Sequence, residues 1–136
     1  MQGRIAMWHA LGDAVTPLDL DTVAACIFTD PEIASVGITQ RHVVSGEVEA
    51  EVMVLPLRTN ARAKMQESED GFVKLYCLPT NHTVIGGVVV APRASELIYA
   101  VALAVTHRLS VEDLAATFTV YPSLSGSIAE AARRLH

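Results

Sequence analysis

Aromatic residues and cysteines are scarce in this 136-residue sequence, and long apolar runs are missing. Aromatic side chains make up only 5% of the residues although hydrophobic residues make up 51%, so the apolar mass is aliphatic. No stretch approaches the ~20 apolar residues of a membrane helix, and no charged segment followed by an apolar run indicates a secretory signal. A soluble domain this apolar is expected to bury surface against a partner subunit or another domain.

Clusters of positive charge are also rare, and the formal net charge is −5. A protein that binds a phosphate backbone needs grouped Lys and Arg side chains, so nucleic acid is not an expected partner. The one basic group, formed by Arg58, Arg62 and Lys64, is followed at once by acidic residues. It could hold an anion, but a solvated loop is the commoner role of such a segment.

The two cysteines, Cys26 and Cys77, stand far apart in apolar segments and form no CxxC motif. This placement favours two reduced thiols in the core over a disulfide or a redox pair. It also fits a cytoplasmic protein. The five histidines have none of the spacings typical of metal ligands, so no metal site is expected.

The hydrophobic pattern places strands before helices. Strand patterns cover residues 23–29, 48–57, 72–78 and 83–90, and the last two are joined as a hairpin. A single helical turn is predicted at Asp30-Pro31-Glu32, because Asp can cap a helix and Pro suits its first position. A short helix is predicted over residues 39–45 and ends at Gly46. This order indicates an α+β fold with an antiparallel sheet.

Helical patterns fill the C-terminal part of the chain. Residues 94–108 are apolar on nearly every side, and such a helix is buried on several sides. Val101 is therefore expected to lie in a contact with a second chain. Ser110 is predicted to cap the next helix together with Asp113, and Ser123 is predicted to cap the last one.

Two further patterns are more readily explained by structure than by chemistry. The Gly86-Gly87 pair lies inside a predicted strand and lacks the glycine spacing of a nucleotide-binding loop, which favours close backbone packing. Ser123 and Ser125 are not surrounded by GxSxG, so helix capping is the better account than nucleophilic attack. Composition and spacing alone indicate an α+β domain but no reaction.

Four stretches resemble the C-terminal interface domain of the pyridine nucleotide–disulfide oxidoreductases, the flavoprotein family of dihydrolipoamide dehydrogenase. They are FTDPEIASVGIT at 28–39, GFVK at 71–74, IGGVVVAP with ASEL within 85–97, and LSVEDL at 109–114. Their order and spacing are those of the family, and they span nearly the whole chain from Val23 onward. The resemblance implies an antiparallel sheet of about five strands with helices packed on one side, which form the interface of a two-fold homodimer.

The same resemblance divides the chain near residue 20. Residues 1–20, with an amphipathic helix at 3–11 and a linker, resemble the tail of the FAD-binding region, and residues 21–136 correspond to the interface domain. Both dinucleotide fingerprints and the redox-active CxxxxC pair are absent. The chain is therefore expected to be a fragment that binds no cofactor and has no activity alone. The parent is expected to use FAD and NAD(P)H, which its missing N-terminal FAD and NAD(P) domains would bind.

Residues 121–126 depart from the family pattern. Members that act on thiols carry His-Pro-Thr-x-x-Glu there, and the His exchanges protons with the thiol while the Glu orients it. Tyr121 replaces this His and Gly126 replaces this Glu, so no catalytic residue is expected in the chain. A phenol ordinarily has a pKa of about 10 and is a poor base near neutral pH. Glu130 is an imperfect substitute for the Glu, whereas Tyr121 and Pro122 are still expected to contact the partner subunit's flavin.

Three functions remain open on this basis. The first is an FAD-dependent NAD(P)H oxidoreductase that reduces quinones or similar non-thiol acceptors, because hydride transfer to the flavin needs no thiol relay. The second is a dihydrolipoamide dehydrogenase-type disulfide reductase whose acid–base group comes from elsewhere. The third is a non-catalytic dimeric interaction module. The upstream sequence would distinguish them, because a CxxxxC motif favours the second and a lack of dinucleotide fingerprints favours the third.

Overall fold

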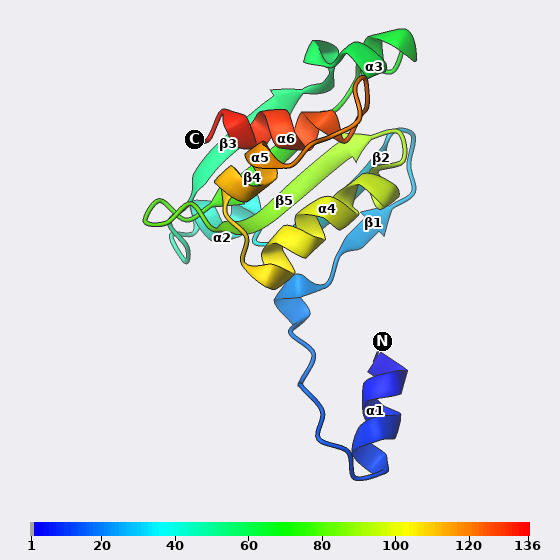
Figure 1. Cartoon of the computed structure of the whole chain (residues 1–136), viewed down its shortest axis with the longest axis vertical. Coiled ribbons are helices and arrows are strands. Elements are labelled where there is room, and N and C mark those ends of the chain that lie inside the picture. The colour runs from blue at the N-terminus through cyan, green and yellow to red at the C-terminus, as the bar shows by residue number, and fades with distance from the viewer. Residues whose placement is uncertain (1) are drawn as a thin grey trace.

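A computed structural model describes residues 2–136 and shows a five-stranded antiparallel sheet covered by helices (Figure 1). The strands are β1 (Ala25–Ile27), β2 (Glu32–Gly37), β3 (Glu51–Pro56), β4 (Phe72–Cys77) and β5 (Val84–Ala91). Their order across the sheet is β1-β2-β5-β4-β3. The predicted α+β class and the antiparallel sheet are confirmed.

Three helices of the C-terminal half cover one face of the sheet (Figure 1). The helices of the chain are α1 (Gln2–Ala10), α2 (Gln40–Val44), α3 (Ala61–Met65), α4 (Ala94–His107), α5 (Val111–Ala116) and α6 (Gly126–Arg133), with 3-10 turns η1 (Leu20–Thr22) and η2 (Leu57–Thr59). Helix α4 packs on β2 and β5, α6 packs on β3 and β4, and α5 packs on α6. No helix in residues 2–136 has the length and apolar character needed to cross a membrane.

The core lies between the sheet and helices α4 and α6. Val73 and Leu75 of β4 and Val89 of β5 are completely buried there. Because neighbouring residues of a strand point to opposite faces, Lys74 points to the other face, where its ammonium donates a hydrogen bond to the side chain of Gln40 in α2. The two faces of β4 therefore meet different elements of the domain.

The glycine pair of β5 is a packing feature, as the sequence predicted. A Cβ atom at Gly87 would lie 2.8 Å from Cγ1 of Val101 and 3.0 Å from the carbonyl oxygen of Lys74. A Cβ atom at Gly86 would lie 2.5 Å from the carbonyl oxygen of Ile38. Glycine is needed at both positions because the sheet and its neighbours approach so closely.

The contact at Gly87 corrects one expectation about α4. Val101 faces the sheet and is completely buried within this chain, so it does not lie in a contact with a second chain. The outward face of α4 carries Tyr99 and Leu103, whose exposed fractions are 67% and 39%. The prediction that α4 meets a partner chain therefore applies to these two side chains.

Residues 30–32 also differ from the sequence prediction, and the strand that begins there was not predicted. Asp30 and Pro31 form a bend with no helical turn, and β2 begins at Glu32. This strand pairs with β1 on one side and β5 on the other, and this long-range pairing overrides the local capping pattern. The backbone amide and hydroxyl of Ser95 donate to the Glu32 carboxylate at 2.9 Å and 2.7 Å, and they lower the pKa of Glu32. Glu32 therefore ties β2 to the start of α4.

The remaining predicted strands are present, but two of them are shorter than predicted. The strands predicted over 23–29 and 48–57 are shorter, at Ala25–Ile27 and Glu51–Pro56. Cys77 is completely buried, burial raises its pKa to about 11, and both cysteines are free. Cys77 is thus the predicted core thiol, whereas Cys26 is only partly buried.

Helix α1 stands apart from the sheet at the end of an extended linker (Figure 1). None of its described side chains is buried, and Met7 and Trp8 are among those exposed. The guanidinium of Arg4 lies 4.9 Å from the centre of the Trp8 ring. The helix expected at 3–11 is thus present, while its assignment to an FAD-binding region stays a prediction.

Candidate functional site

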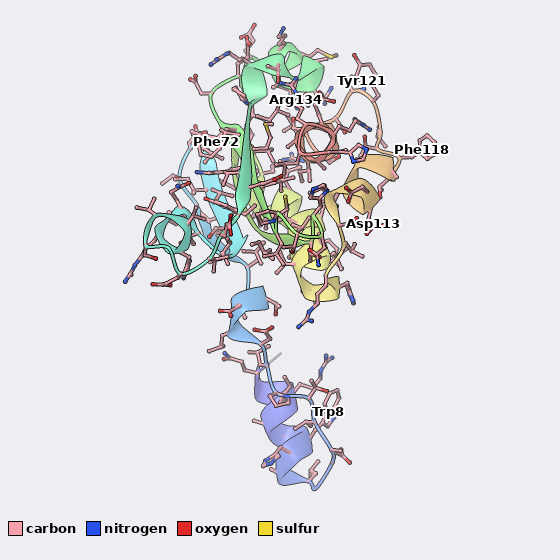
Figure 2. The ribbon with its side chains drawn as sticks, turned by 90° about the vertical axis from the view of Figure 1, so that its left-hand side faces the viewer. Trp8, Phe72, Asp113, Phe118, Tyr121 and Arg134 are labelled. Carbon is pink, nitrogen blue, oxygen red and sulfur yellow. The ribbon has the colours of Figure 1, made fainter. Side chains whose placement is uncertain are left out.

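The segment between α5 and α6 exposes large apolar side chains. We call residues 118–123 the Tyr121 corner. Phe118 and Val120 are exposed, and the exposed fraction of Tyr121 is 86%. Figure 2 shows Phe118 and Tyr121 projecting outward from the body of the molecule. Apolar surface gathered in this way marks a site of interaction, so the Tyr121 corner is the candidate functional site.

The predicted cap of α5 is present, and Ser123 bonds to the start of α6 although it is not the N-cap residue of that helix. Ser110 and Asp113 cap α5 reciprocally: Ser110 Oγ accepts from the Asp113 amide at 3.2 Å, and Asp113 Oδ2 accepts from the Ser110 amide at 2.8 Å. Ser123 Oγ accepts from the amide of Gly126, the first residue of α6, at 3.1 Å. The N-cap position of α6 is Ser125, so Ser123 caps the helix from just outside it.

A cleft of about 260 Å³ opens beside the corner. Tyr121 and Pro122 line one side of it, Thr59 and Asn60 line another, and α6 contributes Gly126. A Cβ atom at Gly126 would lie 3.5 Å from Ser123 Oγ and 3.8 Å from Thr119 Oγ1, which are ordinary contacts. A side chain would fit at position 126, and the glycine leaves this space open.

Glu130 also lines this cleft, but its carboxylate is engaged along α6. Its Oε1 lies 3.1 Å from Nε of Arg134 and its Oε2 lies 3.5 Å from Nη1 of Arg133. Exposed pairs of this kind contribute little stability, but they orient the carboxylate toward the arginines. Within residues 2–136, no hydrogen bond joins Glu130 to Tyr121.

A second cleft, of about 580 Å³, also borders the corner and shares Pro122 and Ser123 with the first. Its polar lining includes Arg62, Gln66 and Arg93. Of the basic group found in the sequence, only Arg62 contributes to this lining. If this cleft holds an anion, the positive charges that face it are those of Arg62 in α3 and Arg93, which directly precedes α4.

The sequence did not predict one pair of ionisable side chains, His82 and Glu112. Glu112 Oε1 lies 2.8 Å from Nδ1 of His82 and 3.3 Å from Nδ1 of His136. The hydrogen bond with His82 lowers the pKa of Glu112 to about 2, and the same bond raises the pKa of His82. The His82 carbonyl oxygen also accepts from the amide of Val111 at 3.0 Å. The pair therefore fastens the loop between β4 and β5 to α5.

No spacing rule could have found this pair, because the two residues are 30 positions apart. In the described part of the chain, no group of three or more His, Cys, Asp or Glu residues is arranged to hold a metal ion. We assign the His82–Glu112 pair a structural role because it links the loop between β4 and β5 to α5.

Residues 23–132 match the family model described as "Pyridine nucleotide-disulphide oxidoreductase, dimerisation domain". The chain therefore belongs to this family, as its sequence motifs implied, and it is the family's dimerisation domain.

Its relatives include proteins with two different names. The chain is 62% identical over 135 residues to "NAD(P)H dehydrogenase (quinone)" of Mycobacterium tuberculosis, a match that covers 99% of this chain and 27% of that protein. It is 35% identical over 128 residues to the mitochondrial dihydrolipoyl dehydrogenase of Pisum sativum, covering 94% of this chain and 26% of that protein. The chain thus spans little more than a quarter of the length of these curated relatives.

Solved structures show the same fold. The crystal structure of LpdA from Mycobacterium tuberculosis has a TM-score of 0.96 at 62% identity, covering 100% of this chain and 30% of that one. The HOCl-induced flavoprotein disulfide reductase RclA from Escherichia coli has a TM-score of 0.85 at 20% identity, covering 98% of this chain and 31% of that one. The second likeness concerns the fold alone.

Proposed function

We propose that this domain is part of a homodimeric, FAD-dependent NAD(P)H oxidoreductase that reduces quinones or similar non-thiol acceptors. In this proposal, residues 1–20 belong to the FAD-binding region and residues 21–136 form the dimerisation domain. The observation that carries it is the pair Tyr121 and Gly126, which occupy the positions of the His and Glu of thiol-active members. The proposal is supported by the open cleft beside Gly126, where a side chain would fit.

The Tyr121 corner suits a flat aromatic group such as the ring system of FAD. Tyr121 presents an exposed ring with one polar hydroxyl, and Pro122 beside it is partly buried. Such an amphipathic ring forms one wall of a site for a planar molecule. We propose that Tyr121 and Pro122 contact the flavin held by the partner subunit. When bound, FAD takes a hydride from NAD(P)H and passes electrons to the acceptor.

The same residues disfavour disulfide chemistry. Reduction of a disulfide releases a thiolate that must be protonated, and a histidine near its ordinary pKa suits that task. The corner offers a phenol in its place, Gly126 offers no carboxylate, and Glu130 is paired with Arg133 and Arg134. The relative named as a quinone dehydrogenase, at 62% identity, supports the non-thiol acceptor.

Dihydrolipoyl dehydrogenase activity is the second candidate. It is favoured by the relatives of that name, which are 34% and 35% identical to this chain. This candidate requires that another part of the parent supplies the acid–base group. A non-catalytic interaction module is the third candidate, and it requires a parent without dinucleotide-binding domains.

The full-length parent enzyme provides the test. NADH and NADPH oxidation would be followed with a soluble quinone, with lipoamide and with glutathione disulfide as acceptors. We expect turnover with the quinone and a kcat/KM for both disulfides that is at least ~100-fold lower, the scale of a missing acid–base group. Comparable values for a disulfide would contradict the proposal. The isolated chain serves as the control, and we expect it to be colourless and inactive.

A further inference from the structure

Asn60 faces the Tyr121 corner and joins two segments that are distant in the sequence. Its Nδ2 donates to the carbonyl oxygen of Ser123 at 2.9 Å and to Oγ of Ser127 at 2.7 Å. Its Oδ1 accepts from the backbone amides of Arg62 at 2.8 Å and Ala63 at 3.2 Å, at the start of α3. Both N–H donors and both acceptor positions of the side-chain amide are therefore used.

The partners of Asn60 fix the orientation of its amide. The backbone amides of Arg62 and Ala63 can only donate, so the Asn60 atom that faces them is the oxygen. The carbonyl oxygen of Ser123 can only accept, so the atom that faces it is the nitrogen. Asparagine satisfies both sides at once. Aspartate would keep the acceptor toward α3 but would lose the donor toward Ser123.

The Tyr121 corner has few other hydrogen bonds. At its N-terminal side, Thr117 Oγ1 donates to the carbonyl oxygen of Asp113 at 2.7 Å. Within residues 2–136, no backbone hydrogen bond involves residues 118–122, and none of their side chains is hydrogen-bonded. After Tyr121, the first hydrogen bond that links the corner to a distant part of the chain is therefore the one from Asn60 Nδ2 to the Ser123 carbonyl oxygen. Ser127, the second partner, is buried in α6.

We infer that Asn60 is a positioning residue for acceptor reduction, because its amide group holds the Tyr121 corner in place against α3. The inference rests on the proposed function, in which Tyr121 and Pro122 form a wall of the reaction site. Asn60 lines the same cleft as Tyr121, yet its amide is saturated by protein groups and acts through the corner. A displacement of about 1 Å at a reacting site can lower a rate roughly a hundredfold.

Three substitutions in the full-length parent separate this role from helix capping. Asn60→Asp keeps the oxygen that caps α3 and removes the donor to Ser123 and Ser127. Asn60→Ala removes both functions. Ser127→Ala removes one acceptor and leaves the bond to the Ser123 carbonyl, so its effect should be smaller than that of either Asn60 substitution.

The measurement is stopped-flow absorbance of the flavin in both half-reactions. We expect Asn60→Asp and Asn60→Ala to slow reoxidation of the reduced enzyme by a quinone by about tenfold or more. Flavin content and the rate of flavin reduction by NAD(P)H should stay within about twofold of the unmodified enzyme, because the corner alone has moved. A merely structural role would lower flavin content and slow both half-reactions.

Two results would overturn the inference while leaving the proposed function intact. One is an Asn60→Asp enzyme that reoxidises at the unmodified rate while Asn60→Ala is slow, which would assign the effect to the cap of α3. The other is equal slowing of both half-reactions with loss of flavin. An unmodified parent that reduces no quinone would contradict the proposed function itself, and the inference with it.

Discussion

The core beneath α4 and the Tyr121 corner use apolar residues in opposite ways. In the core, Val101 is completely buried and would lie 2.8 Å from a Cβ atom added at Gly87. At the corner, Phe118 and Tyr121 extend outward and make little contact with the domain (Figure 2). Burial of apolar surface stabilises a fold by about 25 cal/mol per Å². The exposed side chains of the corner do not contribute this stabilisation. The core therefore maintains the fold, whereas the corner leaves its apolar side chains exposed.

The largest effect is expected in the core, and it is measured by comparing the buried and the outward face of α4. Val101→Glu places a carboxylate in the closed contact with Gly87, and an unpaired buried charge costs several kcal/mol, about 3–5. We expect the chain to be largely unfolded, as measured by far-UV circular dichroism and urea denaturation. Leu103→Glu is the matched control, because Leu103 is 39% exposed on the outward face.

Leu103→Glu should change the free energy of unfolding of a monomer by less than about 1 kcal/mol. Because the outward face of α4 is the one predicted to meet a second chain, it should instead weaken self-association, measured by sedimentation. Equal destabilisation of the fold by both variants would remove the distinction between the two faces.

Two glycines with similar backbone angles test how closely β2 packs against β5. Gly37 has φ +72°, and a Cβ atom there would lie 2.3 Å from the carbonyl oxygen of Ile85. Gly46 has φ +76° but has no atom within 4 Å of the added Cβ. Gly46→Ala therefore measures the backbone strain alone, about 1 kcal/mol. Gly37→Ala adds a clash with the neighbouring strand and should lower the free energy of unfolding by about 2–4 kcal/mol. Equal losses in thermal denaturation would show that the sheet adapts.

At the corner, Tyr121→Ala should lower activity while leaving stability nearly unchanged. The side chain is 86% exposed, so its loss should change the free energy of unfolding by less than about 0.5 kcal/mol. In the full-length parent, we expect kcat/KM for a quinone to fall about tenfold, because an aromatic wall of the site is lost. Phe118→Ala is the control, because Phe118 is an aromatic side chain that is even more exposed than Tyr121 but does not line the cleft. A larger loss of activity in this control would place the site elsewhere.

The smallest effect concerns the His82–Glu112 pair, which fastens α5 just before the corner. Glu112 has its pKa lowered from 4.5 to about 2, so its contribution to stability is present above pH 4.5 and is lost as the pH falls toward 2. His82 has its pKa raised from 6.5, so its contribution is present below pH 6.5 and is lost as the pH rises through the raised value. The melting-temperature difference from Glu112→Gln should therefore be largest between pH 4.5 and 6.5. A difference that does not vary with pH would contradict this account.

Much of the fold could be predicted because local patterns and final packing agree. The strand patterns of residues 72–78 and 83–90 correspond to β4 and β5, and the apolar pattern of residues 94–108 corresponds to α4. The exception is β2, whose Asp30-Pro31 start resembles a helix start. Its strand conformation is set by hydrogen bonds to β1 and β5, which a local pattern does not contain.

The site could be predicted only in part. The departure of Tyr121 and Gly126 from the family motif was visible in the sequence, because both lie within one short segment. The hydrogen bond that holds this segment could not be predicted, because Asn60 and Ser123 are 63 positions apart and meet only in the folded chain. The paired state of Glu130 likewise depends on the side-chain positions of Arg133 and Arg134.

The most direct test of the central claim isolates the step in which we propose that Tyr121 and Gly126 act. The full-length parent would be reduced with one equivalent of NAD(P)H and then mixed rapidly with either a quinone or lipoamide. We predict reoxidation of the flavin by the quinone and, at equal concentration, at least ~100-fold slower reoxidation by lipoamide, the scale of a missing acid–base group. Reoxidation by lipoamide at a rate equal to or above that with the quinone would contradict the account.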